Sequence, residues 1–87
     1  MRLDKFLKNA RLIKRRTLAK EVADQGRIKI NGQPGKAASK LKVGDELYIQ
    51  FGQKLLTIEV KELKETVRKD EAADLYEIKN EEAINKD

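Results

Sequence analysis

The chain has 87 residues with 20 Lys and Arg against 15 Asp and Glu, a net charge of +5, and it contains neither Cys nor His. This length predicts one small domain with a thin core, which leaves little material for a deep catalytic pocket. The missing Cys exclude disulfides and thiolate zinc sites, and the missing His remove the commonest general base and metal ligand. We therefore expect a protein that is not an enzyme and that holds no metal or cofactor.

Apolar residues at helical spacing predict two short helices before residue 26. The first has the apolar stripe Leu3, Phe6, Leu7 and Ala10. The second is expected from about Lys14 to Gln25, with the stripe Leu18, Ala19, Val22 and Ala23 and with Gly26 as the left-handed residue that ends it. Arg15 falls on the apolar side of an ideal wheel, so it must swing outward from the first turn or precede the helix. The two stripes should face each other as a helical hairpin.

Alternating apolar residues predict strands after the helices. Residues 27–30 lead into Asn31-Gly32, a strong hairpin signal, and the return strand should be short and lie at an edge because it contains Pro34. Residues 36–42 should form a polar loop. Residues 47–51 and 56–60 predict a second hairpin with one apolar face that the helices must cover. The expected fold is therefore α+β, a helical hairpin packed on a small antiparallel sheet.

The composition changes near the end of the chain. Residues 61–87 hold six basic and nine acidic side chains. We expect a domain over residues 1–62 and an acidic extension over residues 63–87. Within the extension, residues 72–78 should form one or two helical turns, and residues 81–87 should be frayed.

The segment Arg2–Gly32 holds ten of the twenty cationic side chains and only three carboxylates, a surplus of seven. Such a surplus on a helical hairpin favours a polyanionic partner over a merely lysine-rich surface. Structured RNA fits better than DNA, because the second helix offers Arg and Lys and places only Gln25 among the usual base-reading residues. Tyr48 is expected on the exposed sheet face, where it is equally a stacking contact or a solvated strand residue.

Other candidate sites have simpler explanations. Ser39 lies among lysines and could be a nucleophile only with a Lys as base, so an exposed loop serine explains it better. Asp45 and Glu46 are better explained by a turn beside a strand start than by a metal site. The N-terminus lacks a signal-peptide pattern, and no stretch approaches about 18 apolar residues, so we expect a cytoplasmic protein with no membrane partner.

Four blocks of sequence carry a family resemblance that covers roughly residues 1–60. They are Arg2 to Leu7, Arg15 to Ala19, Gly26 to Gly32 and Val43 to Leu47. In order and spacing they resemble the S-four RNA-binding domain with its alpha-L motif, a fold of two helices on a small antiparallel sheet. Because no catalytic domain is attached, the chain resembles the stand-alone heat-shock-protein-fifteen group. The run from Arg11 to Lys20 and the acidic extension are most similar to the RqcP family of ribosome quality control factors.

This resemblance implies a function and a set of contacts. It implies binding to large ribosomal subunits obstructed by peptidyl-tRNA, at the junction of large-subunit rRNA and the P-site tRNA. It also implies work beside the RqcH protein, which adds alanine tails to stalled nascent chains, and a monomer away from the ribosome. Asn31 and Gly32 would form the family's tight turn. The implied RNA-facing residues are Arg2, Lys5, Lys8, Arg11, Arg15, Arg16, Thr17, Lys20 and Lys29.

Two departures and three alternatives accompany this resemblance. Val43 stands where the family often has Pro, and Gly35 where it often has a β-branched residue, so both should weaken the sheet more than RNA binding. One alternative is a large-subunit recycling factor of the heat-shock-protein-fifteen type. The second is a protein-interaction module that works through its acidic tail. The third, a fragment of an RNA-modifying enzyme, is disfavoured because no second domain is present.

Overall fold

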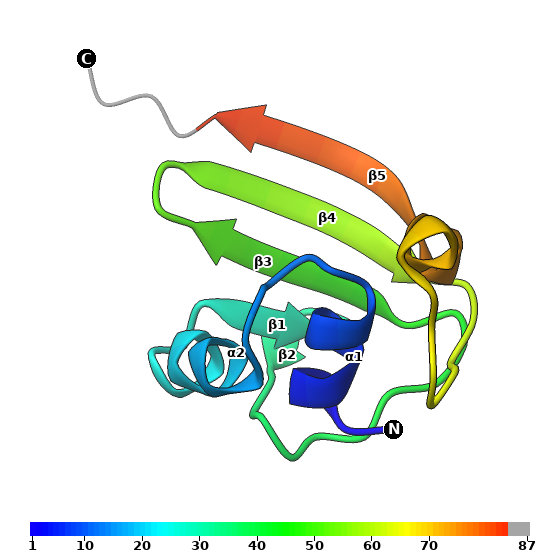
Figure 1. Ribbon diagram of the computed structural model, residues 1–87. Helices are drawn as coiled ribbons and strands as arrows, with labels where there is room; N and C mark the ends of the chain where they lie inside the picture. Colours follow the sequence, from blue (N-terminus) through cyan, green and yellow to red (C-terminus); the bar gives the residue numbers. More distant parts are fainter. Residues whose placement is uncertain (84–87) are drawn as a thin grey trace.

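A computed structural model describes residues 1–83 of the chain, and these residues form two helices packed on one face of a twisted antiparallel sheet (Figure 1). The helices are α1 (Leu3–Asn9) and α2 (Arg16–Asp24), and a 3₁₀ helix, η1 (Lys69–Leu75), comes late in the chain. The strands are β1 (Ile28–Ile30), β2 (Gln33–Pro34), β3 (Glu46–Phe51), β4 (Lys54–Val60) and β5 (Tyr76–Ala83). The expected α+β architecture is confirmed. None of the helices in this part of the chain is both long and apolar enough to cross a membrane.

The core lies between the helices and the sheet, as the apolar periodicities predicted. All four residues of the α1 stripe are buried, with Leu3, Phe6 and Leu7 fully enclosed. From the sheet, alternate residues of β3 and β4 meet them, among them Leu47, Ile49, Ile58 and Val60. Because side chains alternate along a strand, the residues between these point to the other face of the sheet, which the helices leave uncovered.

The second helix is shorter than predicted. It begins at Arg16, because Arg15 is extended (φ −126°, ψ 140°) and precedes the helix as its N-cap residue. This settles where Arg15 lies, and its side chain is exposed. Leu18 was wrongly placed in the apolar stripe: it is 46% exposed, whereas Ala19 and Ala23 are buried. Gly26 has a φ of +75° and ends the helical region as predicted.

Turns fall where the sequence placed them. Asn31 and Gly32 both have positive φ, at 52° and 85°, the conformation of a two-residue type I′ hairpin between β1 and β2. The Asn31 side chain also reaches β3, because its Oδ1 accepts a hydrogen bond from the Glu46 amide (2.9 Å) and its Nδ2 donates to Asp45 Oδ1 (3.0 Å). The turn therefore fixes two hairpins relative to each other. The strand order is β2-β1-β3-β4-β5, with every pair antiparallel.

The end of the chain differs from the prediction. Only η1 is helical, and Tyr76 and Ile78 lie in β5, which pairs with β4 from Val60↔Tyr76 to Lys54↔Ala83. Pairing wins because β4 would otherwise leave a row of unpaired backbone groups at the sheet edge. The fraying predicted for residues 81–87 is wrong for 81–83, and residues 84–87 lie outside the described part. The boundary proposed at residue 62 stays a prediction, although Leu75 from the extension is fully buried in the core.

Candidate nucleic-acid interface

A buried carboxylate organises the cationic side chains at the start of both helices. Asp4, in the first turn of α1, is only 4% exposed. Its Oδ1 accepts hydrogen bonds from Arg2 Nε (3.2 Å) and from the Lys5 amide (2.8 Å), and its Oδ2 lies 3.2 Å from Arg16 Nε. One carboxylate therefore holds two guanidinium groups, one from the residue that precedes α1 and one from the first residue of α2.

The charge at this cluster remains positive. Burial alone would raise the pKa of the Asp4 carboxyl, but the Arg16 hydrogen bond and charge, the Lys5 amide and the Arg2 charge together outweigh burial and lower the pKa below its ordinary 3.8. Asp4 is therefore ionised at neutral pH and cancels one of the two guanidinium charges. Arg2 and Arg16 remain 49% and 46% exposed, so each presents several N–H donors to a ligand.

A second set of cations surrounds a groove at the end of α1. The groove has a volume of about 500 Å³ and is lined by Lys8, Arg11 and Lys14, with Asn9, Ile13 and Val67 beneath them. None of the three cations forms an ion pair within residues 1–83. Arg11 has a φ of +58°, a left-handed conformation that is unusual for a non-glycine residue and fixes where its side chain leaves the turn. Free cations around a groove favour binding of an anionic group.

The start of α2 continues this surface. Arg15 and Thr17 line a shallow cavity of about 380 Å³ together with Lys14, and all three are exposed. Lys20 is one turn after Arg16 and is also exposed. These residues extend the cationic surface along α2. Glu21 also lines the cavity but forms no ion pair within residues 1–83.

Two of the nine predicted residues are placed differently from the rest. Lys5 Nζ lies 2.9 Å from Glu65 Oε1, and this contact lowers the pKa of Glu65, so the extension already neutralises Lys5. Lys29 lies on β1 between Ile28, which is buried, and Ile30, and it lines a groove with Tyr48, its direct partner on β3. Eight of the nine therefore lie on or beside α1 and α2, and seven of these form no ion pair with the described part of the extension: Arg2, Lys8, Arg11, Arg15, Arg16, Thr17 and Lys20.

Two residues of this surface were not among the predicted site residues. The sequence patterns gave Asp4 no role at the site, but the structure makes it the link between Arg2 and Arg16. A signal was present, since it is the only carboxylate among the first 20 residues. Lys14 lines two cavities, and its place in a run of three cations was the available signal. We refer to these two residues and the seven above as the helical face.

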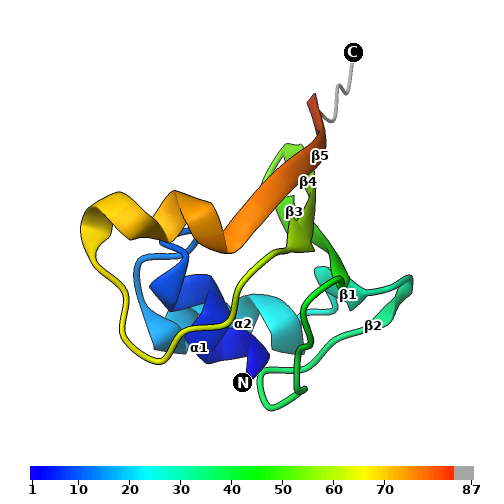
Figure 2. The ribbon, with the colours of Figure 1, turned by 90° about the vertical axis from the view of Figure 1, so that its right-hand side faces the viewer.

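Two polar contacts hold the extension against α1. The side-chain amide of Asn9 donates to the backbone oxygen of Lys64 (3.0 Å), and Lys5 contacts Glu65. Figure 2 shows the chain between β4 and η1 passing beside the helices.

The clustered metal ligands considered for Asp45 and Glu46 are not found among the described residues. Asp45 serves the turn instead, because its Oδ2 accepts a hydrogen bond from the Lys42 amide (2.8 Å). Glu46 begins β3, where its carboxylate accepts a hydrogen bond from the Tyr48 hydroxyl.

Comparisons with known proteins find similar sequences and a similar fold. The S4 domain family profile matches residues 1–47, the span from α1 to the start of β3. The chain is 66% identical over 86 residues to the RQC P-site tRNA stabilizing factor of Halalkalibacterium halodurans, covering 99% of this chain and 98% of that protein. It is 67% identical over 84 residues to the protein of the same name in Bacillus subtilis, covering 97% and 98%. Vibrio cholerae heat shock protein 15, described as trimeric, matches with a TM-score of 0.84 at 32% identity over 90% of this chain and 80% of that one.

Proposed function

The chain belongs to the S4 domain family and to the family of RQC P-site tRNA stabilizing factors, and from this premise we propose that it is a non-enzymatic RNA-binding protein of ribosome quality control. It binds large ribosomal subunits obstructed by peptidyl-tRNA and contacts both large-subunit rRNA and the tRNA. The observation that carries the proposal is the helical face, where Asp4 holds Arg2 and Arg16 together and the neighbouring cations have no carboxylate partner within residues 1–83.

The geometry supports backbone contacts. Guanidinium groups bind phosphates through paired hydrogen bonds, and their positions are already fixed by Asp4, so little side-chain freedom is lost when RNA binds. Contacts of this kind position a protein on folded RNA without reading its sequence. In the proposed mechanism the helical face bridges rRNA and the P-site tRNA and stabilises that tRNA position. RqcH can then add alanine to the stalled chain in repeated cycles.

Cosedimentation with purified ribosomal particles tests the binding step. We expect the tagged protein to sediment with large subunits that carry peptidyl-tRNA, and neither with small subunits nor with intact ribosomes. Arg16→Ala should weaken this binding about tenfold, a loss of about 1.4 kcal/mol, while the helical circular dichroism signal is kept. Lys79→Ala is the matched control, because it removes one charge from a fully paired position and should bind normally. Recovery with free tRNA alone would contradict the proposal.

Alanine tailing in cells tests the partnership with RqcH. A strain that carries Arg16→Ala should lose alanine tails on stalled nascent chains, and RqcH should no longer be recovered together with tRNA-bearing large subunits. If tails persist while obstructed large subunits accumulate, the protein acts instead as a recycling factor of the heat-shock-protein-fifteen type.

The acidic extension offers a second test. Removing it would also remove β5 and the buried Leu75, so deletion cannot separate function from folding. The variants Asp70→Asn and Asp74→Asn instead change exposed carboxylates that have no ion pair within the described residues. We expect these variants to keep activity. Loss of activity with normal subunit binding would favour a protein-interaction module in the extension.

A further inference from the structure

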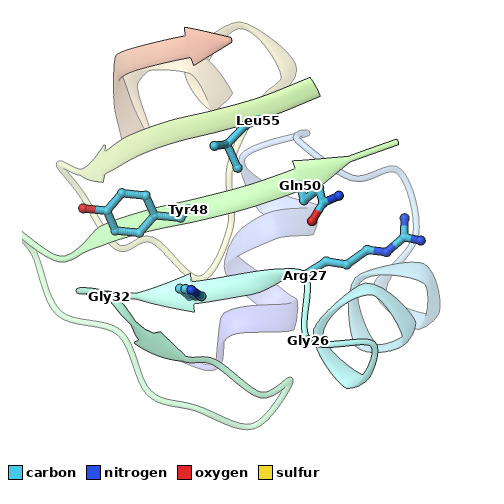
Figure 3. A pocket seen from close by; sticks show the side chains of 7 residues that line it. Gly26, Arg27, Gly32, Tyr48, Gln50 and Leu55 are labelled. Carbon is cyan, nitrogen blue, oxygen red and sulfur yellow. The ribbon is translucent and has the colours of Figure 1, made fainter. Parts of the chain in front are cut away.

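The sheet face opposite α1 carries a groove that the proposed function leaves unused. It crosses β1, β3 and β4, has a volume of about 370 Å³, and is lined by Arg27, Lys29, Tyr48, Gln50 and Leu55 (Figure 3). In this view α1 lies behind the sheet and α2 lies beside it, so the groove opens on the sheet face that α1 does not cover. This volume lies near the lower end of the range for small-ligand sites.

An aromatic ring lies at the centre of this groove and is held in place. Tyr48 pairs directly with Lys29 across the sheet, and its hydroxyl donates a hydrogen bond to Glu46 Oε1 at 2.9 Å. That hydrogen bond raises the pKa of the Tyr48 hydroxyl, so the ring stays uncharged at neutral pH. The half-buried Leu55 lies on the neighbouring strand and completes an apolar floor.

Two cationic side chains lie along the β1 side of the groove, Lys29 beside Tyr48 and Arg27 beside Gln50. Both are exposed and form no ion pair with any residue among 1–83. Glu46 lies on the side of Tyr48 away from Gln50, where it accepts the Tyr48 hydrogen bond. Gln50, beside Arg27, carries an amide that both donates and accepts hydrogen bonds. The groove therefore combines two free cations, a flat apolar surface and the Gln50 amide, which can form hydrogen bonds with the polar edge of a ring.

From this arrangement we propose that the groove binds one unpaired nucleotide of RNA. The base stacks on Tyr48 beside Leu55, its edge meets the Gln50 amide, and the flanking phosphates lie against Arg27 and Lys29. Stacking on an aromatic side chain suits any base, and phosphate contacts add affinity that depends on salt. A duplex cannot use this site, because its bases are already stacked, so the groove selects a looped-out or terminal nucleotide.

This site is separate from the helical face, and it gives Lys29 a role in RNA binding. Lys29 lines the groove beside Tyr48, whereas the other predicted RNA-facing residues lie on or beside α1 and α2. Two faces that each bind RNA would let the protein contact paired and unpaired nucleotides at once.

Nuclear magnetic resonance on the isotope-labelled full chain tests the inference with two separate probes. The pentaribonucleotide UUAUU should shift the amide signals of residues 27–29 and 48–50. A stable RNA hairpin whose only unpaired bases are those of its loop should instead shift the amide signals of α1 and α2. Tyr48→Ala should weaken UUAUU binding about tenfold, whereas Tyr48→Phe, which keeps the ring, should bind within about twofold of wild type. Lys29→Ala should lower the log–log salt slope for UUAUU by about 0.7.

The outcomes separate this inference from the proposed function. If UUAUU shifts only helical residues, or if Tyr48→Ala and Lys29→Ala both bind it normally, the groove is not a nucleotide site and the helical face is unaffected. If the hairpin leaves α1 and α2 unshifted while UUAUU occupies the groove, the proposed function fails and this inference stands. If the groove prefers a penta-glutamate peptide to UUAUU, its ligand is an acidic protein segment. If Tyr48→Ala fails to fold, the binding of UUAUU to Lys29→Ala, a change at an exposed position, decides whether the groove is a nucleotide site.

Discussion

Two regions of this molecule are rich in Lys or Arg, yet only one of them presents a surplus of positive charge. On the helical face, Arg2 and Arg16 share the single carboxylate of Asp4. At the outer edge of the sheet, Lys61 and Lys79 each contact both Glu59 and Glu77, a set we call the β4–β5 charge network. The first arrangement leaves a net positive charge, and the second leaves none.

The difference shows that a surface suits phosphate when its cations lack carboxylate partners, and not simply when it holds many cations. In the β4–β5 charge network the hydrogen bond from Lys61 lowers the pKa of Glu59, and Glu59 in turn raises the pKa of Lys61, so all four groups stay charged and satisfied. Such a network covers the last strand of the sheet and discourages further strand pairing at this edge. Asp4 works differently, because it orients two cations and neutralises only one.

The largest expected effect comes from removing the carboxylate on the helical face. Asp4→Asn should lower the free energy of unfolding by about 2–3 kcal/mol, because a buried acceptor of charged hydrogen bonds is lost and two guanidinium groups are left close together. Urea unfolding followed by circular dichroism measures it. Glu59→Gln, within the β4–β5 charge network, is the matched control and should leave the midpoint nearly unchanged. Equal losses in both variants would mean that the two regions do not differ.

Arg11→Gly should change stability and RNA affinity in opposite directions. Arg11 adopts a φ of +58°, which glycine tolerates without strain, so the free energy of unfolding should rise by about 1 kcal/mol. The same substitution removes a free cation from the groove beside Lys8, so the log–log salt slope for RNA binding should fall by about one. Urea unfolding and binding titrations at several salt concentrations give the two numbers. A lower affinity with lower stability would show instead that the side chain supports the fold.

Acid should weaken the helical face through Asp4. Its pKa is lowered by folding, so the stabilisation that it contributes is complete above the ordinary value of 3.8 and is lost as the pH falls toward the lower folded value. The free energy of unfolding should therefore drop between pH 5 and pH 3, and this drop should be smaller in Asp4→Asn than in wild type. Urea midpoints at the two pH values provide the measurement. An identical drop in both proteins would assign the acid sensitivity to other carboxylates.

The smallest effect is expected where the extension meets α1. Glu65→Gln frees Lys5 from its partner, so RNA affinity at low salt should rise roughly twofold, and the gain should vanish at high salt. The change is small because the Glu65 side chain is 74% exposed and solvent screens the pair. Fluorescence anisotropy with labelled RNA can detect a difference of this size. A decrease in affinity would mean that Glu65 positions Lys5 for binding.

Local signals in the sequence were sufficient for much of the fold. The stripe of α1, the left-handed Gly26, the Asn31-Gly32 hairpin and the β3–β4 alternation depend on residues within a few positions of one another, and all were confirmed. The surplus of cations before residue 33 was equally visible in the sequence. Such patterns are reliable because helix and strand periodicity and turn geometry are set by the chain's nearest neighbours.

Tertiary structure alone decided which cations are free. Asp4 and Arg16 are 12 positions apart and Lys5 and Glu65 are 60 apart, so neither contact leaves a local pattern. The same holds for β5, whose short alternation became a strand only because β4 offered an unpaired edge, and for Lys29, which the sheet places beside Tyr48. The sequence by itself determined the elements and the excess of positive charge. Long-range packing determined which of those charges a ligand can reach, because an ion pair or a strand pairing depends on the whole chain being folded.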